Sequence, residues 1–159
     1  MQPTSVLLAA WLAAGAPTGA GAPACQGTVS GSVQGAFSCS VSLRPGDEGM
    51  AVLVIEAVAP IPGVPAVSPG AFEIPEPVRE GVYTLDTLGQ GLASLAAEGG
   101  TLYTAARTSG KRGEVQVTLT EVRADPERKG HRIVRGVYRA RLVPVGSGRT
   151  GSVVIEVRF

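Results

Sequence analysis

The sequence predicts an all-β fold, and three observations support that prediction. Apolar and polar residues alternate with a period of two in several segments, which is typical of strands with one buried face. The composition after the first 25 residues favours Val and Thr, the β-branched residues that suit strands. Gly and Pro, 22 and 12 of the 159 residues, gather between the alternating segments as turn residues do.

The first strands are expected between residues 29 and 58. Apolar residues keep one parity over residues 29–43, with serines at most of the positions between them. This pattern predicts either one long strand bent at its glycines or two strands joined by a connection of odd length. A turn follows at residues 44–47, and the almost continuous apolar run Met50–Val58 predicts a central strand buried on both faces.

The middle of the chain is less regular. Six prolines lie between Pro60 and Pro77, and because proline cannot donate to a ladder, this stretch is expected to be a loop or an edge crossing. Residues 82–85 resume a strand. The leucines of residues 88–96 fit helical spacing, although the glycines there limit a helix to a turn or two. Residues 101–107 form another short strand.

The C-terminal third alternates most clearly. Strands are predicted at residues 114–122, 132–143 and 153–159, with a charged loop after the first of them. The segment Gly146–Gly151 matches the dinucleotide-binding pattern G-x-G-x-x-G, but the residues that follow are β-patterned, so a hairpin turn is predicted instead.

Short strands joined by turns predict one antiparallel β-sandwich domain over residues 25–159, immunoglobulin-like or jelly-roll-like. The alternative is a small β-barrel.

Residues 1–24 predict a cleavable secretory signal peptide. The apolar run Val6–Ala14 is too short to span a bilayer, and Ala22 and Ala24 form an A-x-A cleavage site. The expected location is therefore the periplasm, the cell surface or the medium. The first five residues lack Lys and Arg, so a mobile tail or an apolar helix packed on the domain is the alternative.

Export predicts a disulfide between Cys25 and Cys39, the two cysteines of the chain. In one extended strand their Cα atoms would lie about 46 Å apart, far beyond the ~7 Å that a disulfide allows. The bond therefore requires the chain to turn back, at Gly31 or Gly35. Acylation of Cys25, as in a lipoprotein, would exclude the bond and is the competing hypothesis.

Charge is unevenly distributed. Residues 101–159 hold twelve Lys/Arg against five acidic residues, whereas residues 1–100 hold two against eight. Arg135, Arg139 and Arg141 share one face of a predicted strand and form a candidate basic contact face for an anionic envelope component or another envelope protein. The alternative is pairing between oppositely charged strands of one domain. Nucleic acid is not an expected partner, because aromatic side chains do not interleave with these arginines.

Catalytic and metal-binding signals are weak. His131, the one histidine, is the only candidate base for a small secreted hydrolase, and no G-x-S-x-G motif accompanies it. Zinc-ligand spacings are missing from the sequence, and Glu73, Glu76 and Glu80 are more typical of a solvated acidic loop than of a calcium site. No cofactor or metal is predicted. The few aromatic residues also disfavour a carbohydrate-binding face of the usual kind, which presents aromatic platforms.

The mature region resembles a loose group of small exported β-domain proteins, some of them lipoproteins, from GC-rich bacteria. The resemblance rests on strand-and-turn segments spread over the chain, and it implies export and a β-sandwich without implying an activity. The segments are residues 35–39, 72–75, 81–85 and 113–120 and the final Phe159.

The sequence thus predicts an exported protein of the cell envelope or medium with a non-enzymatic binding or structural role. Three alternatives stay open: a lipoprotein anchored through Cys25, which alone would place it at a membrane, a small secreted hydrolase and a small outer-membrane β-barrel. The last is suggested by the alternating segment that ends at Phe159.

Overall fold

The computed structural model describes residues 24–159, which contain strands and turns but no helix. The predicted signal peptide and Ala22 lie outside the described residues, while Ala24 is exposed and directly precedes the first strand. Nothing in residues 24–159 forms a helix long and apolar enough to cross a membrane. The strands are β1 (Cys25–Gly31), β2 (Gly35–Pro45), β3 (Met50–Ala57), β4 (Ala66–Pro75), β5 (Gly81–Thr84), β6 (Gly91–Ala96), β7 (Leu102–Arg107), β8 (Lys111–Arg112), β9 (Glu114–Ala124), β10 (Arg132–Pro144) and β11 (Val153–Arg158).

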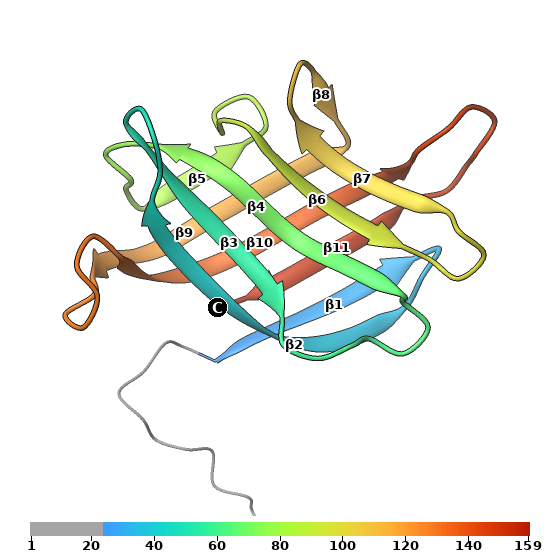
Figure 1. Cartoon of the computed structure of the whole chain (residues 1–159), viewed down its shortest axis with the longest axis horizontal. Helices are drawn as coiled ribbons and strands as arrows, with labels where there is room; N and C mark the ends of the chain where they lie inside the picture. Colours follow the sequence, from blue (N-terminus) through green and yellow to red (C-terminus); the bar gives the residue numbers. More distant parts are fainter. Residues whose placement is uncertain (1–23) are drawn as a thin grey trace, which may run out of the picture.

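Eight strands form a closed antiparallel barrel in the order β10-β11-β1-β2-β3-β4-β6-β7 (Figure 1). The barrel closes where β7 pairs with the end of β10, with Thr104 opposite Val143 and Tyr103 opposite Pro144. Strands β9 and β5 extend the sheet from β10, and β8 extends it from β7. The all-β prediction is confirmed. The architecture is the small β-barrel that was predicted as the alternative, and not the sandwich.

The length of β10 explains why a barrel forms. This strand of 13 residues pairs along one edge with β9 and then with β7. Its other edge pairs with β11 and, at Arg132, with Leu43 of β2. One strand thereby joins parts of the sheet that a sandwich would keep as two separate layers. Alternation with a period of two is common to both architectures and does not distinguish them.

The first two strands form a hairpin, as one of the sequence-based alternatives required. The chain turns back after Gly31, whose φ of 97° suits glycine, and residues 32–34 form a connection of odd length. Cys25 lies directly opposite Cys39 in the ladder, with their Cα atoms 4.9 Å apart, and the two are joined by a disulfide. The disulfide prediction is therefore confirmed.

Over residues 66–75, strand β4 corrects the prediction that residues 60–77 form a loop or an edge crossing, whereas residues 60–65 and 76–77 lie outside the named strands. The strand lies between β3 and β6, although it contains Pro69 and Pro75. The register with β6 shifts between Ser68 and Ala71, and the pairing with β3 begins only after Pro69. Pro69 therefore sits in a bulge where the ladder does not need its missing N–H, and Pro75 ends the strand.

Residues 88–96 correct the second local prediction. The segment from Gly91 to Ala96 is strand β6 rather than a helical turn. Ala93 and Leu95 are buried between β4 and β7, while Leu92 points outward with 44% of its surface exposed. The leucine spacing is compatible with the period of a helix and with that of a strand, and the strands on either side determine which one applies.

Large apolar side chains fill the barrel interior. Tyr138 of β10 is completely buried, and its hydroxyl donates a hydrogen bond of 2.7 Å to the backbone oxygen of Pro69. Its ring lies 6.4 Å from the ring of Phe72. Gly70 makes room for it, since a Cβ there would come within 2.6 Å of the Tyr138 hydroxyl. The bulge in β4 and the tyrosine of β10 therefore fit together inside the barrel.

Candidate binding face

The three arginines of the candidate basic contact face project from one side of β10. Burial alternates along the strand, so that Arg135, Arg139 and Arg141 are exposed while their neighbours in sequence point into the barrel. This outer side continues without interruption over β5, β9, β10, β11, β1 and β2, which are consecutive neighbours in the sheet.

Carboxylates on the neighbouring strands compensate these arginines. Arg135 lies 3.0 Å from Glu121 of β9, and Arg139 lies 3.3 Å from Glu156 of β11. Arg141 stands opposite Glu114 in the β9–β10 register. The expected surplus of positive charge is therefore largely cancelled on this face, because acidic residues of adjacent strands come into register with the arginines.

A first groove of about 520 Å³ runs over β5, β9 and β10. It contains Arg139 and Arg141 but not Arg135. Its wall includes the turn after β5 and the hairpin that β7 and β8 form. Its lining residues are Thr84, Leu85, Asp86, Lys111, Gly113, Glu114, Val115, Gln116, Arg139 and Arg141.

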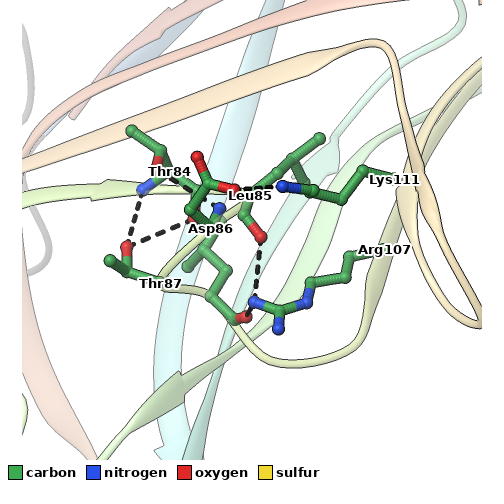
Figure 2. A network of polar contacts seen from close by, with 7 residues as sticks. Thr84, Leu85, Asp86, Thr87, Arg107 and Lys111 are labelled. Atoms are coloured by element: carbon green, nitrogen blue, oxygen red, sulfur yellow. Dashed lines mark hydrogen bonds and ion pairs between the residues drawn. The ribbon is translucent and has the colours of Figure 1, made fainter.

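Hydrogen bonds fix the wall of the first groove (Figure 2). The Thr84 N–H donates to the Thr87 hydroxyl at 2.9 Å. Arg107 of β7 donates to the backbone oxygen of Leu85 at 2.9 Å, and also to that of Leu88. Lys111 pairs with Asp86, and this hydrogen bond holds the pKa of the Asp86 carboxyl below its usual range. The turn is therefore tied to β7 and β8, so the groove has a defined shape.

A second groove of about 660 Å³ lies over β10, β11, β1 and β2. Phe37 lines it but is only 8% exposed, because its ring packs against Gly27. The lining residues are Gln26, Gly27, Thr28, Ala36, Phe37, Ser38, Val137, Glu156 and Arg158.

The two grooves share one line of residues across the sheet, which we call the central row. Each member stands opposite the next in the register of adjacent strands, and each lines one of the two grooves. The Arg139–Glu156 ion pair joins the two grooves, because Arg139 lines the first and Glu156 the second. The central row is Thr84, Gln116, Arg139, Glu156, Thr28 and Ala36.

His131 lies elsewhere, beside a pocket of about 670 Å³ at the end of the barrel that holds the β9–β10 loop. Glu76 of that pocket pairs with Arg132, whose hydrogen bond lowers the pKa of the Glu76 carboxyl. Within residues 24–159, the Nδ1 atom of His131 is buried without a hydrogen-bond partner. The residues lining this pocket include no Ser, Thr, Cys or Tyr that could serve as a nucleophile for His131.

Of the three glutamates considered as a calcium site, Glu73 and Glu76 are engaged within the fold, and Glu80 is exposed. Glu73 accepts a hydrogen bond from the Gln90 N–H at 3.0 Å, while Glu76 is engaged by Arg132. In the part of the chain that is described, His, Cys, Asp and Glu side chains do not gather in threes as a metal site requires. The glycine-rich segment Gly146–Gly151 lies in the connection between β10 and β11.

The central row was missed by sequence reasoning. Its six residues come from strands as distant in sequence as β1 and β11, and only the strand order brings them together. Arg139 was the one member with a sequence signal. No family model, curated protein or solved structure matches the chain.

Proposed function

We propose that the chain is an exported, non-enzymatic binding protein of the cell envelope or medium, which acts through the outer face of its barrel. The Cys25–Cys39 disulfide is the observation on which this proposal rests. Disulfides persist in secreted and periplasmic proteins and are rare in the reducing cytosol. Together with the apolar leader and the A-x-A pattern before Cys25, the bond supports export.

The polarity of β9, β10 and β11 supports a protein that functions in water. Inward positions of β9, β10 and β11 are apolar, while outward positions carry charged and amide side chains such as Glu114, Gln116, Arg139 and Glu156. An outer-membrane barrel has the opposite arrangement, with an apolar band facing lipid. The outward charges therefore favour surface contact with a polar partner over insertion into a bilayer.

The disulfide also bears on how the protein is held in the envelope. A lipoprotein carries its thioether on the sulfur of the first mature cysteine, and the sulfur of Cys25 is already bonded to Cys39. A released, disulfide-linked form is therefore favoured over a form tethered through Cys25.

Intact-mass spectrometry of the protein purified from its native host tests the proposal. We expect the mass of residues 25–159 less two hydrogens, and no reaction with a thiol-alkylating reagent until a reductant is added. An unprocessed chain with two free thiols would contradict export, and an added diacylglycerol mass would show the lipoprotein instead. If hydrolase activity is found, its full retention in His131→Ala would exclude the His131 mechanism.

A further inference from the structure

The chemistry of the two grooves points to a class of ligand, on the premise that the face is a binding surface as proposed above. Four cationic and three acidic side chains line the grooves, so the charges nearly balance. An anion would meet the carboxylates of Asp86, Glu114 and Glu156 together with the cations. Simple charge attraction therefore does not select a polyanion here.

Five of the six side chains in the central row instead carry hydrogen-bond donors or acceptors, and Ala36 is the exception. Arg139 supplies only donors and Glu156 only acceptors, while the amide of Gln116 and the hydroxyl of Thr28 supply both. Arg139 and Glu156 are 63% and 53% exposed at their side chains, so their remaining hydrogen-bonding capacity faces solvent. A ligand whose groups each donate and accept hydrogen bonds fits this arrangement, and the hydroxyl groups of sugars have that property.

The shape of the face indicates an extended ligand. The central row crosses six strands, and five gaps of about 4.8 Å give a path of about 24 Å along the curved outer surface of the sheet. Val137, 41% exposed, adds an apolar contact along the second groove. Because Phe37 is buried and the lining residues include no exposed aromatic ring, each sugar would gain little by stacking. Affinity must then be accumulated over several contacts along the row.

We propose that the two grooves and their central row bind an extended glycan through its hydroxyl groups, with successive sugars crossing the strands from β5 towards β2. Arg139 and Glu156 occupy the middle of the row and contact the glycan from both grooves. Affinity is expected to increase with chain length, because a single sugar engages only one or two members of the row.

Titration of the isotope-labelled protein, in the form that its host exports, with defined oligosaccharides tests this proposal by NMR. The neutral probes are cellohexaose, maltohexaose and chitohexaose, compared with their monosaccharides, and the acidic probe is hexagalacturonate. We expect at least one neutral hexamer to shift amide signals of β9 and β10 in the first groove and of β11 and β1 in the second. Its monosaccharide should bind at least about tenfold more weakly.

Two arginine variants provide a matched comparison. Arg139→Gln removes charged donors from the central row and should weaken binding of that hexamer about tenfold or more. Arg135→Gln removes a similar exposed ion pair on the same strand, but Arg135 lines neither groove, so its affinity should stay within about twofold of the parent. Equal losses in both variants would overturn the proposal.

The acidic probe separates the competing ligand class. Binding of hexagalacturonate alone, lost at high salt, would identify an anion site and refute recognition through hydroxyl groups. Failure of every hexamer to shift signals from both grooves would also refute the glycan site. Neither result would bear on whether the protein is exported and disulfide-linked, because intact mass tests these properties independently.

Discussion

Among individual residues, Tyr138 connects the sequence most directly to the fold. Its hydroxyl meets the Pro69 carbonyl, its ring contacts Phe72, and Gly70 leaves the space that it occupies. Burial raises the pKa of Tyr138, so the phenol remains protonated and keeps its role as donor. The hydrogen bond joins β10 to the bulge of β4 inside the barrel.

Removal of that hydroxyl should destabilise the barrel. Tyr138→Phe leaves the buried Pro69 carbonyl without its donor, and the free energy of unfolding should fall by about 1–3 kcal/mol, as measured by urea denaturation. Tyr83→Phe is the control, because the Tyr83 hydroxyl bonds the backbone of Arg79 at the surface, where water can replace it. Equal losses in the two variants would show that the buried hydrogen bond contributes no more to the free energy of unfolding than the exposed one.

Among the strands, the β1–β2 hairpin depends on the disulfide at its open end. The bond closes a loop with a sequence separation of 14 residues, and loss of such a cross-link costs about 3 kcal/mol in the chain-entropy model. The double variant Cys25→Ser, Cys39→Ser should lose about that much stability in urea denaturation. Reduction of the parent protein should lower its stability to a similar extent, and a parent whose stability is unchanged by reductant would contradict this role.

The same strands show which features the sequence can predict. Alternation located β9, β10 and β11 well, because each has one buried face and turn residues at both ends. The expectation that prolines exclude a strand failed for β4, since the effect of Pro69 depends on a bulge whose partners lie in other strands. Alternation failed for β6 because a leucine spacing compatible with two periods is decided by neighbouring strands.

The candidate site was predictable only in part, for the same physical reason. Parity alone placed Arg135, Arg139 and Arg141 on one face of a strand. Their partners Glu121 and Glu156 depend on which strands lie beside β10 and in which register, and a single strand carries no information on either. The sequence therefore left an anionic partner and pairing between oppositely charged strands as alternatives, and the strand order supplies the pairing for Arg135 and Arg139.

For the molecule as a whole, charged residues are distributed unequally between the two ends of the barrel. At the right of Figure 1, the loops that join β1 to β2, β3 to β4, β6 to β7 and β10 to β11 carry only Glu98 and Arg149 as charged residues. The opposite end holds the ion pairs of Glu76 with Arg132, Asp86 with Lys111, and Asp125 with Arg128. The ion pairs at the ends of the barrel therefore lie at one of its two ends, while Arg135–Glu121 and Arg139–Glu156 lie on its side.

The ion pairs at this end should make the free energy of unfolding depend on pH in the acidic range. The pKa values of all three carboxyls are lowered: Glu76 by the hydrogen bond from Arg132, Asp86 by that from Lys111, and Asp125 first by the backbone N–H of Glu127. A carboxyl with a lower pKa in the folded state stabilises the fold above its unfolded pKa. That contribution is lost as the pH falls through the folded value. The free energy of unfolding should therefore change little between about pH 7 and 5.5 and decrease below about pH 4.5.

The Glu76–Arg132 pair allows this acid dependence to be assigned to a residue. The carboxyl of Glu76 is partly shielded from solvent, with 30% of its side chain exposed. Glu76→Gln removes the group that ionises. The variant should lose under about 1 kcal/mol at pH 7, because solvent screens a pair whose side chains remain partly exposed. It should lose less stability than the parent between pH 6 and 3. Urea denaturation of both proteins at each pH measures the difference. Parallel curves would show that the acid dependence arises from other carboxyls.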